Sequence, residues 1–256
     1  MKLPTEKTDI ETDPAKFTYF FYTPPGLGKT TFASGLPDVM FVDTERGTKH
    51  LSVFKVDVDT WEDFRTIVLE LMKGDHHFQT IIIDTVGRLI EMCIRYCMKT
   101  MGIQHPSEAG WGAGWDKCKK EWDNTITKLI YSPYGLWFLG HSTTRTITMD
   151  GGAKKEDYIE PDMPNFIGKL VIPICDFIFY GQMLNIQKKD EKGKVLSSNN
   201  QRVIRTQTNP SFRAKQRSGV SKPIPDKIIM DPTEPTCKTF LEVFGNYLRQ
   251  QRELNA

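Results

Sequence analysis

One segment near the start of the chain constrains its fold more than any other: Thr23-Pro24-Pro25-Gly26-Leu27-Gly28-Lys29-Thr30. It follows an aromatic, strand-like run at 17–22 and precedes a helix-compatible run at 29–34. A strand, a glycine-containing loop that ends in Gly-Lys-Thr and a helix, in that order, are the context of a phosphate-binding loop (P-loop). The sequence therefore predicts a P-loop at the carboxyl end of the first strand.

In a P-loop, backbone N–H groups and the N-terminus of the following helix bind phosphate. Lys29 is expected to reach the β- and γ-phosphates of a nucleotide, and the Thr30 hydroxyl to ligate Mg²⁺. ATP and Mg²⁺ are therefore the predicted cofactors, although no motif that reads the base distinguishes ATP from another nucleoside triphosphate. The expected nucleotide-binding residues are Pro25, Gly26, Leu27, Gly28, Lys29, Thr30 and Thr31.

Thr23 is a departure from the P-loop pattern, which has glycine at this position. If the position needs a positive φ, a β-branched residue is strained there and the loop is reshaped. The alternative to a P-loop is a chance glycine-rich turn, which the flanking strand and helix patterns disfavour.

The composition is that of an ordinary soluble globular protein, with 39% hydrophobic and 26% charged residues in 256. That length suggests one large domain, or one domain with a short appendage. No apolar run is long enough to span a bilayer and the N-terminus lacks the apolar stretch of a signal peptide, so we expect a cytoplasmic protein without membrane contact. The five cysteines have no framework spacing, which favours reduced thiols.

Strand-like and helix-like patterns alternate along the chain. This alternation predicts an α/β fold with a mostly parallel central sheet flanked by helices. We expect a flexible N-terminal segment (1–16), a core (17–230) and a C-terminal helix (231–256). The strand-like runs are at 17–22, 39–43, 78–85, 135–141, 176–181 and 202–206, and the helical patterns at 29–34, 61–72, 86–101, 116–129, 165–171 and 232–251.

Polar residues follow three of these strands. Asp84 ends an apolar strand, which we expect beside the P-loop strand, where its carboxylate meets the Mg²⁺ shell; the alternative is an N-cap for the next helix. Glu45 is the candidate that orients or deprotonates the attacking water, with Asp43 as its rival. His141 ends another strand and is either a sensor of the γ-phosphate or an ordinary strand-end histidine.

The formal net charge is only +2, so a generally basic nucleic-acid binder is not indicated. One segment, 201–223, is nevertheless basic. It contacts phosphates or forms a solvated face, and the sequence leaves both alternatives open. Its cations are Arg202, Arg205, Arg213, Lys215, Arg217 and Lys222.

The order of these motifs resembles that of the phage-encoded, RecA-like AAA ATP-binding proteins, some of which act as single-strand annealing proteins in recombination. The similarity covers residues 17–230 and implies a RecA-type core that binds ATP with Mg²⁺. It also implies that Glu45 is the catalytic glutamate and His141 the polar sensor. The motifs that carry it lie at 22–31, 41–48, 81–85, 110–115, 139–141 and 214–217.

The same resemblance implies two DNA-binding loops, at 110–115 and 142–163. Trp111 and Trp115 would stack on bases, although core or interface packing is the alternative for both. Arg145, Lys154 and Lys155 would contact phosphates. Lys215 and Arg217 resemble basic residues that complete the site of a neighbouring subunit. The implied partners are single-stranded DNA, further copies of the chain and a single-strand binding protein, in the host cytoplasm if the protein is phage-encoded.

Three functions are compatible with these residues. The first is an ATP-dependent recombination protein that acts on single-stranded DNA as an oligomer, either ring or filament. The second is a P-loop ATPase that loads or remodels a replication protein such as a helicase. The third is a nucleotide-binding regulator with little turnover. A metabolic kinase is disfavoured because no lid-like arginine cluster follows the P-loop.

Overall fold

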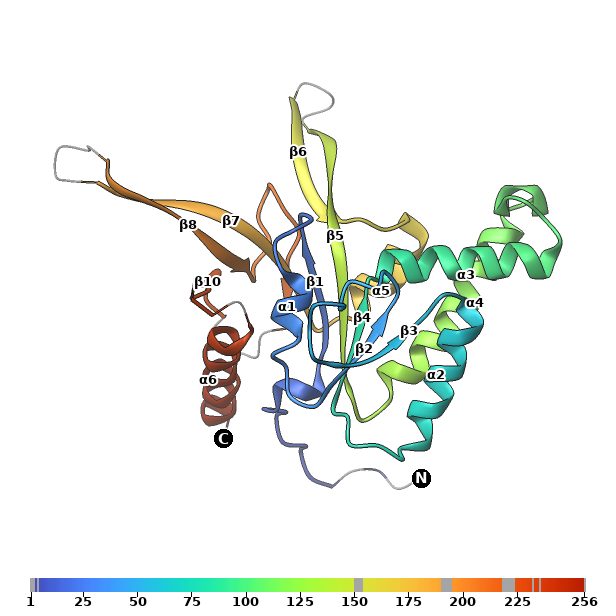
Figure 1. The fold of residues 1–256 in the computed structure, drawn as a ribbon, viewed down its shortest axis with the longest axis horizontal. Coiled ribbons are helices and arrows are strands. Elements are labelled where there is room, and N and C mark those ends of the chain that lie inside the picture. The colour runs from blue at the N-terminus through green and yellow to red at the C-terminus, as the bar shows by residue number, and fades with distance from the viewer. Residues whose placement is uncertain are drawn as a thin grey trace.

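A central sheet with helices on both faces forms the body of the molecule (Figure 1). The computed structural model describes residue 3 and residues 5–149, 154–189, 195–217, 224–231, 233–234 and 236–255. Among the helices of this part of the chain, none is long and apolar enough to cross a membrane.

Parallel strands occupy the middle of the sheet, in the spatial order β7, β1, β5, β4, β2, β3. The predicted α/β fold with a mostly parallel sheet is thus confirmed. One expected neighbour is wrong: β5 lies between the P-loop strand β1 and the strand β4 that carries Asp84. The bounds are β1 (Thr18–Thr23), β2 (Val39–Asp43), β3 (Phe54–Asp57), β4 (Thr80–Asp84), β5 (Gly135–Met149) and β7 (Phe177–Lys189).

Antiparallel strands extend this sheet at one edge and beyond its carboxyl end. β5 and β7 both continue past the parallel core and pair there with β6 and β8, so that two ribbons project from the body (Figure 1). The β5–β6 ribbon shows that the chain forms a hairpin after His141, and the glycines Gly151 and Gly152, whose sequence favours a hairpin tip, lie outside the described residues. The antiparallel strands are β6 (Lys154–Pro161), β8 (Val195–Arg205), β9 (Lys215–Gln216) and β10 (Lys227–Ile229).

Two hydrophobic cores lie on the two faces of the sheet. Successive side chains of a strand point to opposite faces, and β1 shows this directly: Phe20 and Tyr22 join one core, Tyr19 and Phe21 the other. The first core includes α2 (Trp61–Lys73), α3 (Val86–Met101), α4 (Ala113–Ile130) and α5 (Asn165–Ile174), and the second includes α1 (Lys29–Ala33) and α6 (Lys238–Asn255). Two short 3₁₀ helices, η1 (Pro14–Lys16) and η2 (Pro106–Ala109), complete the described elements.

Local sequence signals explain several element boundaries. α2 begins with a capping box, in which the Thr60 side chain accepts from the Asp63 N–H and the Asp63 side chain accepts from the Thr60 N–H, and Gly74 ends the helix with a φ of 73°. The helix α3 spans the residues that the pattern predicts. The C-terminal helix begins later than predicted, at Lys238, and packs into the second core through Phe240 and Phe244. The three-part division of the chain is otherwise untested.

Candidate functional site

The P-loop connects the end of β1 to the start of α1. Gly26 and Gly28 have φ angles of 79° and 91°, which only glycine adopts without strain. Within the described chain, the backbone N–H groups of residues 26–29 have no acceptor. Unbonded N–H groups at a helix start bind anions readily, so the loop fits a phosphate.

Thr23 does not strain this loop. It ends β1 in extended conformation, and it is not among the residues with positive φ. Its hydroxyl donates to the Pro24 carbonyl at 2.8 Å, and its side chain is buried. The condition for strain, a positive φ at this position, is therefore not met, because the positive φ falls at Gly26 and not at Thr23.

Thr30 and Asp84 meet although their elements are not adjacent. Thr30 Oγ1 donates to Asp84 Oδ2 at 2.7 Å, across the end of the intervening strand β5. Asp84 is 3% exposed, and this burial raises the pKa of its carboxyl, while the Thr30 hydroxyl and the charge of Lys29 oppose the rise. The N-cap of α3 is Thr85, not Asp84. The geometry thus places the predicted magnesium ligands together.

A magnesium ion at this position would need ligands beyond these two side chains. In the part of the chain that the structure describes, no group of three or more His, Cys, Asp or Glu residues could hold a metal ion by itself. Mg²⁺ typically takes one or two protein ligands together with substrate phosphates and waters. The pair Thr30–Asp84 beside the unbonded P-loop N–H groups fits that pattern.

Asp43 organises the loop that follows β2. Its carboxylate accepts hydrogen bonds from the N–H groups of Glu45, Gly47 and Thr48 and from the Thr48 hydroxyl. Burial alone would raise the pKa of Asp43, but these hydrogen bonds together lower it. Since its oxygens accept these hydrogen bonds, Asp43 fixes the backbone of the loop that carries Glu45, and which of the two carboxylates activates a water stays a prediction.

Glu45 lies within reach of Thr85 and His141. The Thr85 hydroxyl donates to Glu45 Oε1 at 2.5 Å, and His141 Nε2 is 3.7 Å from Glu45 Oε2. Glu45 is 39% exposed. A carboxylate held by one oxygen and open to solvent at the other can bind and orient a water molecule.

His141 lies inside β5 and not at its end, which corrects the sequence-based boundary. It pairs with Thr23 as the last step of the β1–β5 ladder, and the pairing with β6 begins at Ser142. Its Nδ1 is buried and has no hydrogen-bond partner among the described residues. His141 therefore links the P-loop strand, Glu45 and the β5–β6 ribbon.

Sequence reasoning did not assign two residues of this site. Thr85 directly follows Asp84, and only its side-chain contact with Glu45 reveals a role. Arg202 comes from β8: a Cβ added to Gly28 would lie 3.6 Å from its guanidinium carbon. The basic character of 201–223 was the available signal for Arg202, but its partner could not be found without the β7–β8 pairing.

The two tryptophans have different environments. Trp111 is fully exposed and has a φ of 46°. Trp115 belongs to α4 and not to a loop, and its ring packs against Phe166 and His105 at 5.0 and 5.6 Å. For Trp115 the packing alternative therefore has structural support, whereas Trp111 is free to stack.

The predicted phosphate-binding cations lie on the β5–β6 ribbon. Arg145 Nε is 2.6 Å from Glu160 Oε1. Lys155 is exposed and pairs with Thr148 across the ribbon. Lys154 begins β6, and its side chain lies outside the described part. Whether these residues bind DNA stays a prediction.

Lys215 and Arg217 are both engaged within their own chain. Lys215 Nζ donates to the carbonyls of Ile172, Pro173 and Cys175 at the end of α5, at 3.1, 2.9 and 2.6 Å. Arg217 pairs with Asp176 at 3.2 Å. The single chain thus gives them a structural role, and their action on a neighbouring subunit stays a prediction.

The other cations of the basic segment have different environments. Arg205 and Arg213 form ion pairs with Asp226 and Glu160, at 3.6 and 3.4 Å. Arg202 has no such pair among the described residues and lies at the P-loop. Lys222 lies outside them.

Comparisons with known proteins agree with the motif. A family model described as "AAA domain" matches residues 15–218. No curated protein matches the sequence.

Solved structures with some similarity include the flagellar accessory protein FlaH from Methanocaldococcus jannaschii, 10% identical with a TM-score of 0.42, covering 84% of this chain and 85% of that one. A prototypical ATPase from the type III secretion system of pathogenic bacteria is 14% identical with a TM-score of 0.40 over 65% of this chain. The chain spans 52% of the length of that ATPase.

Proposed function

Because the chain belongs to the AAA-domain family of P-loop ATPases, we propose that it binds ATP with Mg²⁺, hydrolyses it, and acts on single-stranded DNA as an oligomer. The binding of ATP with Mg²⁺ is supported by the 2.7 Å hydrogen bond between Thr30 and Asp84, which lies beside the unbonded N–H groups of the P-loop. Two side chains 54 positions apart in sequence meet there with the oxygen ligands that Mg²⁺ prefers.

The binding step rests on the main chain of the P-loop. The N–H groups of residues 26–29 and the start of α1 bind the phosphates, and Lys29 adds a positive charge. Arg202 approaches Gly28 from β8 and adds a second cation. Bound Mg²⁺ would neutralise charge on the phosphate oxygens, and Thr30 and Asp84 are the side chains that would hold it.

The hydrolytic step rests on Glu45. Its carboxylate orients the attacking water and accepts its proton. Thr85 fixes one oxygen of that carboxylate, and the loop that Asp43 organises fixes its backbone. His141, 3.7 Å from Glu45, is placed to respond to the nucleotide and to pass that response into the β5–β6 ribbon, because both belong to β5.

The DNA part of the proposal is supported by the position of this ribbon and by two of its cations. The ribbon begins one residue after His141, so a change at the nucleotide site reaches it directly. It carries Arg145 and Lys155, and cationic side chains on a projecting element suit a phosphate backbone. The sequence resemblance to annealing proteins favours single-stranded DNA. A role as loader of a replication protein is the alternative that the experiment below separates.

The test is the ATPase rate with and without single-stranded DNA, at several salt concentrations. We expect DNA to stimulate turnover, and the stimulation to fall steeply with salt. If the ATPase rate does not change with DNA but rises when a helicase is added, the loader function replaces the proposed one. Lys29→Ala should abolish turnover, and Glu45→Gln should stop hydrolysis while nucleotide binding persists; unchanged turnover in both variants would refute the assigned site.

A further inference from the structure

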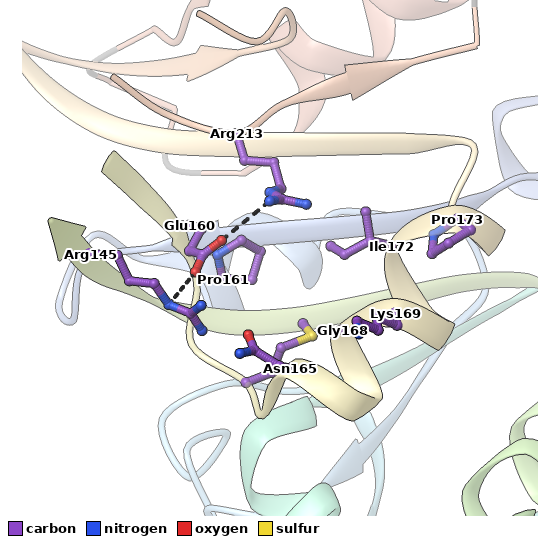
Figure 2. Close-up of a pocket in the computed structure, with 10 residues that line it drawn as sticks. Arg145, Glu160, Pro161, Asn165, Gly168, Lys169, Ile172, Pro173 and Arg213 are labelled. Atoms are coloured by element: carbon purple, nitrogen blue, oxygen red, sulfur yellow. Dashed lines mark ion pairs between the residues drawn. The ribbon is translucent and has the colours of Figure 1, made fainter. Parts of the chain in front are cut away.

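A solvent-accessible cavity of about 390 Å³ lies between the base of the β5–β6 ribbon and α5, apart from the P-loop. Figure 2 shows its walls. This volume falls within the range of small-ligand sites. Its lining includes Arg145, Glu160, Lys169, Ile172, Pro173 and Arg213.

The charges of this cavity favour an anion. Its lining carries three cations, Arg145, Lys169 and Arg213, and one carboxylate, Glu160. Glu160 lies between the two guanidinium groups, 2.6 Å from Arg145 and 3.4 Å from Arg213 (Figure 2). Lys169 has no ion pair within the described chain. One carboxylate therefore faces three positive charges, and the lining has an excess of two.

The hydrogen bonds leave donors free. A guanidinium group has five N–H donors, and the contacts of Arg145 and Arg213 with Glu160 are ion pairs that leave Glu160 Oε1 without a hydrogen-bond partner among the described residues. Arg213 Nε is buried and has no hydrogen-bond partner among the described residues. A phosphate group, with several acceptor oxygens, would satisfy such donors and form charge-assisted hydrogen bonds to both arginines.

The wall across from Arg145 and Glu160 belongs to α5 (Figure 2). It includes the apolar side chains of Ile172 and Pro173 together with Lys169, and Met163 is a further apolar lining residue. A ligand that fills both parts has an anionic group on one side and a flat, apolar body on the other. A nucleotide unit has this chemistry, since every base has a face that packs on apolar side chains.

Hydrogen bonds connect residues at the cavity wall to β5, which carries His141, and to β1, which leads into the P-loop. The Asp162 N–H, next to Pro161, donates to the His141 carbonyl at 2.8 Å. The Tyr22 hydroxyl, at the end of the P-loop strand, donates to the Arg213 carbonyl at 2.5 Å. Occupancy of the cavity and of the P-loop can therefore influence each other through short, direct contacts.

We propose that this cavity binds one nucleotide unit of a DNA single strand, with the phosphate at Arg145 and Arg213 and the base against Ile172 and Pro173. Lys169, on α5 beside these apolar residues, adds positive charge to the same cavity. Glu160 occupies the phosphate position in the free protein and competes with it. A strand is the favoured source over a free nucleotide because the cavity opens to solvent at the base of a projecting ribbon, where a polymer can continue in both directions. The proposal rests on the proposed function for its ligand.

The experiment measures the binding of a fluorescein-labelled oligothymidylate by fluorescence anisotropy, with Mg·ADP saturating the P-loop. Arg145→Ala and Arg213→Ala should each weaken binding about tenfold, since a hydrogen bond to a charged group contributes about 1.5–3 kcal/mol. Glu160→Gln should strengthen binding several-fold, because it removes the competing charge. Lys169→Glu, at an exposed position, should weaken binding at least as much without affecting the fold.

Arg65→Ala is the matched control. Arg65 is 46% exposed and pairs with Glu121, which is 15% exposed; the values for Arg145 and Glu160 are 45% and 13%. The control should bind the strand as the native protein does. If the cavity variants bind no more weakly than Arg65→Ala, the proposal is wrong. If thymidine monophosphate binds as tightly as the strand and with the same dependence on Arg145, the site takes a free nucleotide and the strand proposal is overturned.

The rate of ATP hydrolysis without DNA distinguishes a failure of the cavity proposal from a failure of the proposed function. Turnover in the native protein with no effect of the cavity variants on DNA binding would refute the cavity alone. Absence of turnover would refute the proposed function.

Discussion

Replacing Thr85 with valine tests how Glu45 is held. Valine keeps the shape and β-branching of threonine at a buried position but removes the hydroxyl that donates to Glu45 Oε1 at 2.5 Å. The backbone contacts of residue 85 with Thr44 remain, because they involve only its N–H and carbonyl. The substitution therefore isolates one hydrogen bond.

The expected magnitude follows from the exposure of Glu45. A hydrogen bond to a charged group contributes about 1.5–3 kcal/mol, which corresponds to a rate change of roughly 10- to 150-fold. Because Glu45 is 39% exposed, water can replace the lost donor, so the low end applies. We expect kcat for ATP hydrolysis to fall about tenfold and KM to stay within about twofold, since the P-loop contacts do not involve Thr85.

Steady-state ATPase kinetics test whether the Thr85 hydroxyl positions Glu45, with Thr85→Ser as the control that keeps the hydroxyl. A serine variant close to native and a valine variant reduced in kcat would support a positioning role. A valine variant with native kcat would refute the reasoning, provided that Glu45→Gln is inactive. A rise in KM without a change in kcat would place Thr85 in nucleotide binding instead.

Three further predictions concern stability. Phe240→Ala removes a fully buried ring that packs on Phe32, Trp137, Phe179 and Phe244, so urea unfolding should show a loss of about 3–5 kcal/mol; a loss below about 1 kcal/mol would mean that α6 is not part of the core. The pKa of the Asp43 carboxyl is lowered, so its ionised form stabilises the folded protein above the pKa of the unfolded chain, about 4, and this stabilisation is lost as pH falls through the lower folded value. Asp43→Asn should therefore reduce the fall in the free energy of unfolding at acid pH, and an unchanged fall would contradict this. Burial raises the pKa of the Asp84 carboxyl, so ionisation of this group lowers the free energy of unfolding as pH rises through the folded pKa. Asp84→Asn should therefore raise the thermal midpoint of the nucleotide-free protein at neutral pH. A lower midpoint would contradict this and would show that neighbouring groups stabilise the buried charge.

Much of the core could be predicted from sequence because its signals are local. The three isoleucines of β4 mark a strand buried on both faces, and α2 carries its caps at Thr60 and Gly74. The P-loop, Asp84 and Glu45 follow from residue type and position relative to strand ends. These features depend on a few neighbouring residues and need no knowledge of strand order.

Other features depend on pairing between distant segments. The outer halves of β7 and β8 form a ribbon that includes exposed polar residues such as Asn185 and Asn200, so no buried apolar run marks them as strands. The four residues of β3 are all exposed and give no burial pattern. The position of β5 between β1 and β4 follows from the crossovers, and the contacts of Thr85 and Arg202 follow from that order.

The affinity of the protein for an ATP analogue, measured with Mg²⁺ and with the metal chelated, tests the central assignment most directly. With Thr30 and Asp84 as the metal-binding side chains, Mg²⁺ should strengthen binding to the native protein at least about tenfold and should have little effect on Asp84→Asn. An equal effect of Mg²⁺ on the native protein and on Asp84→Asn would contradict the assignment.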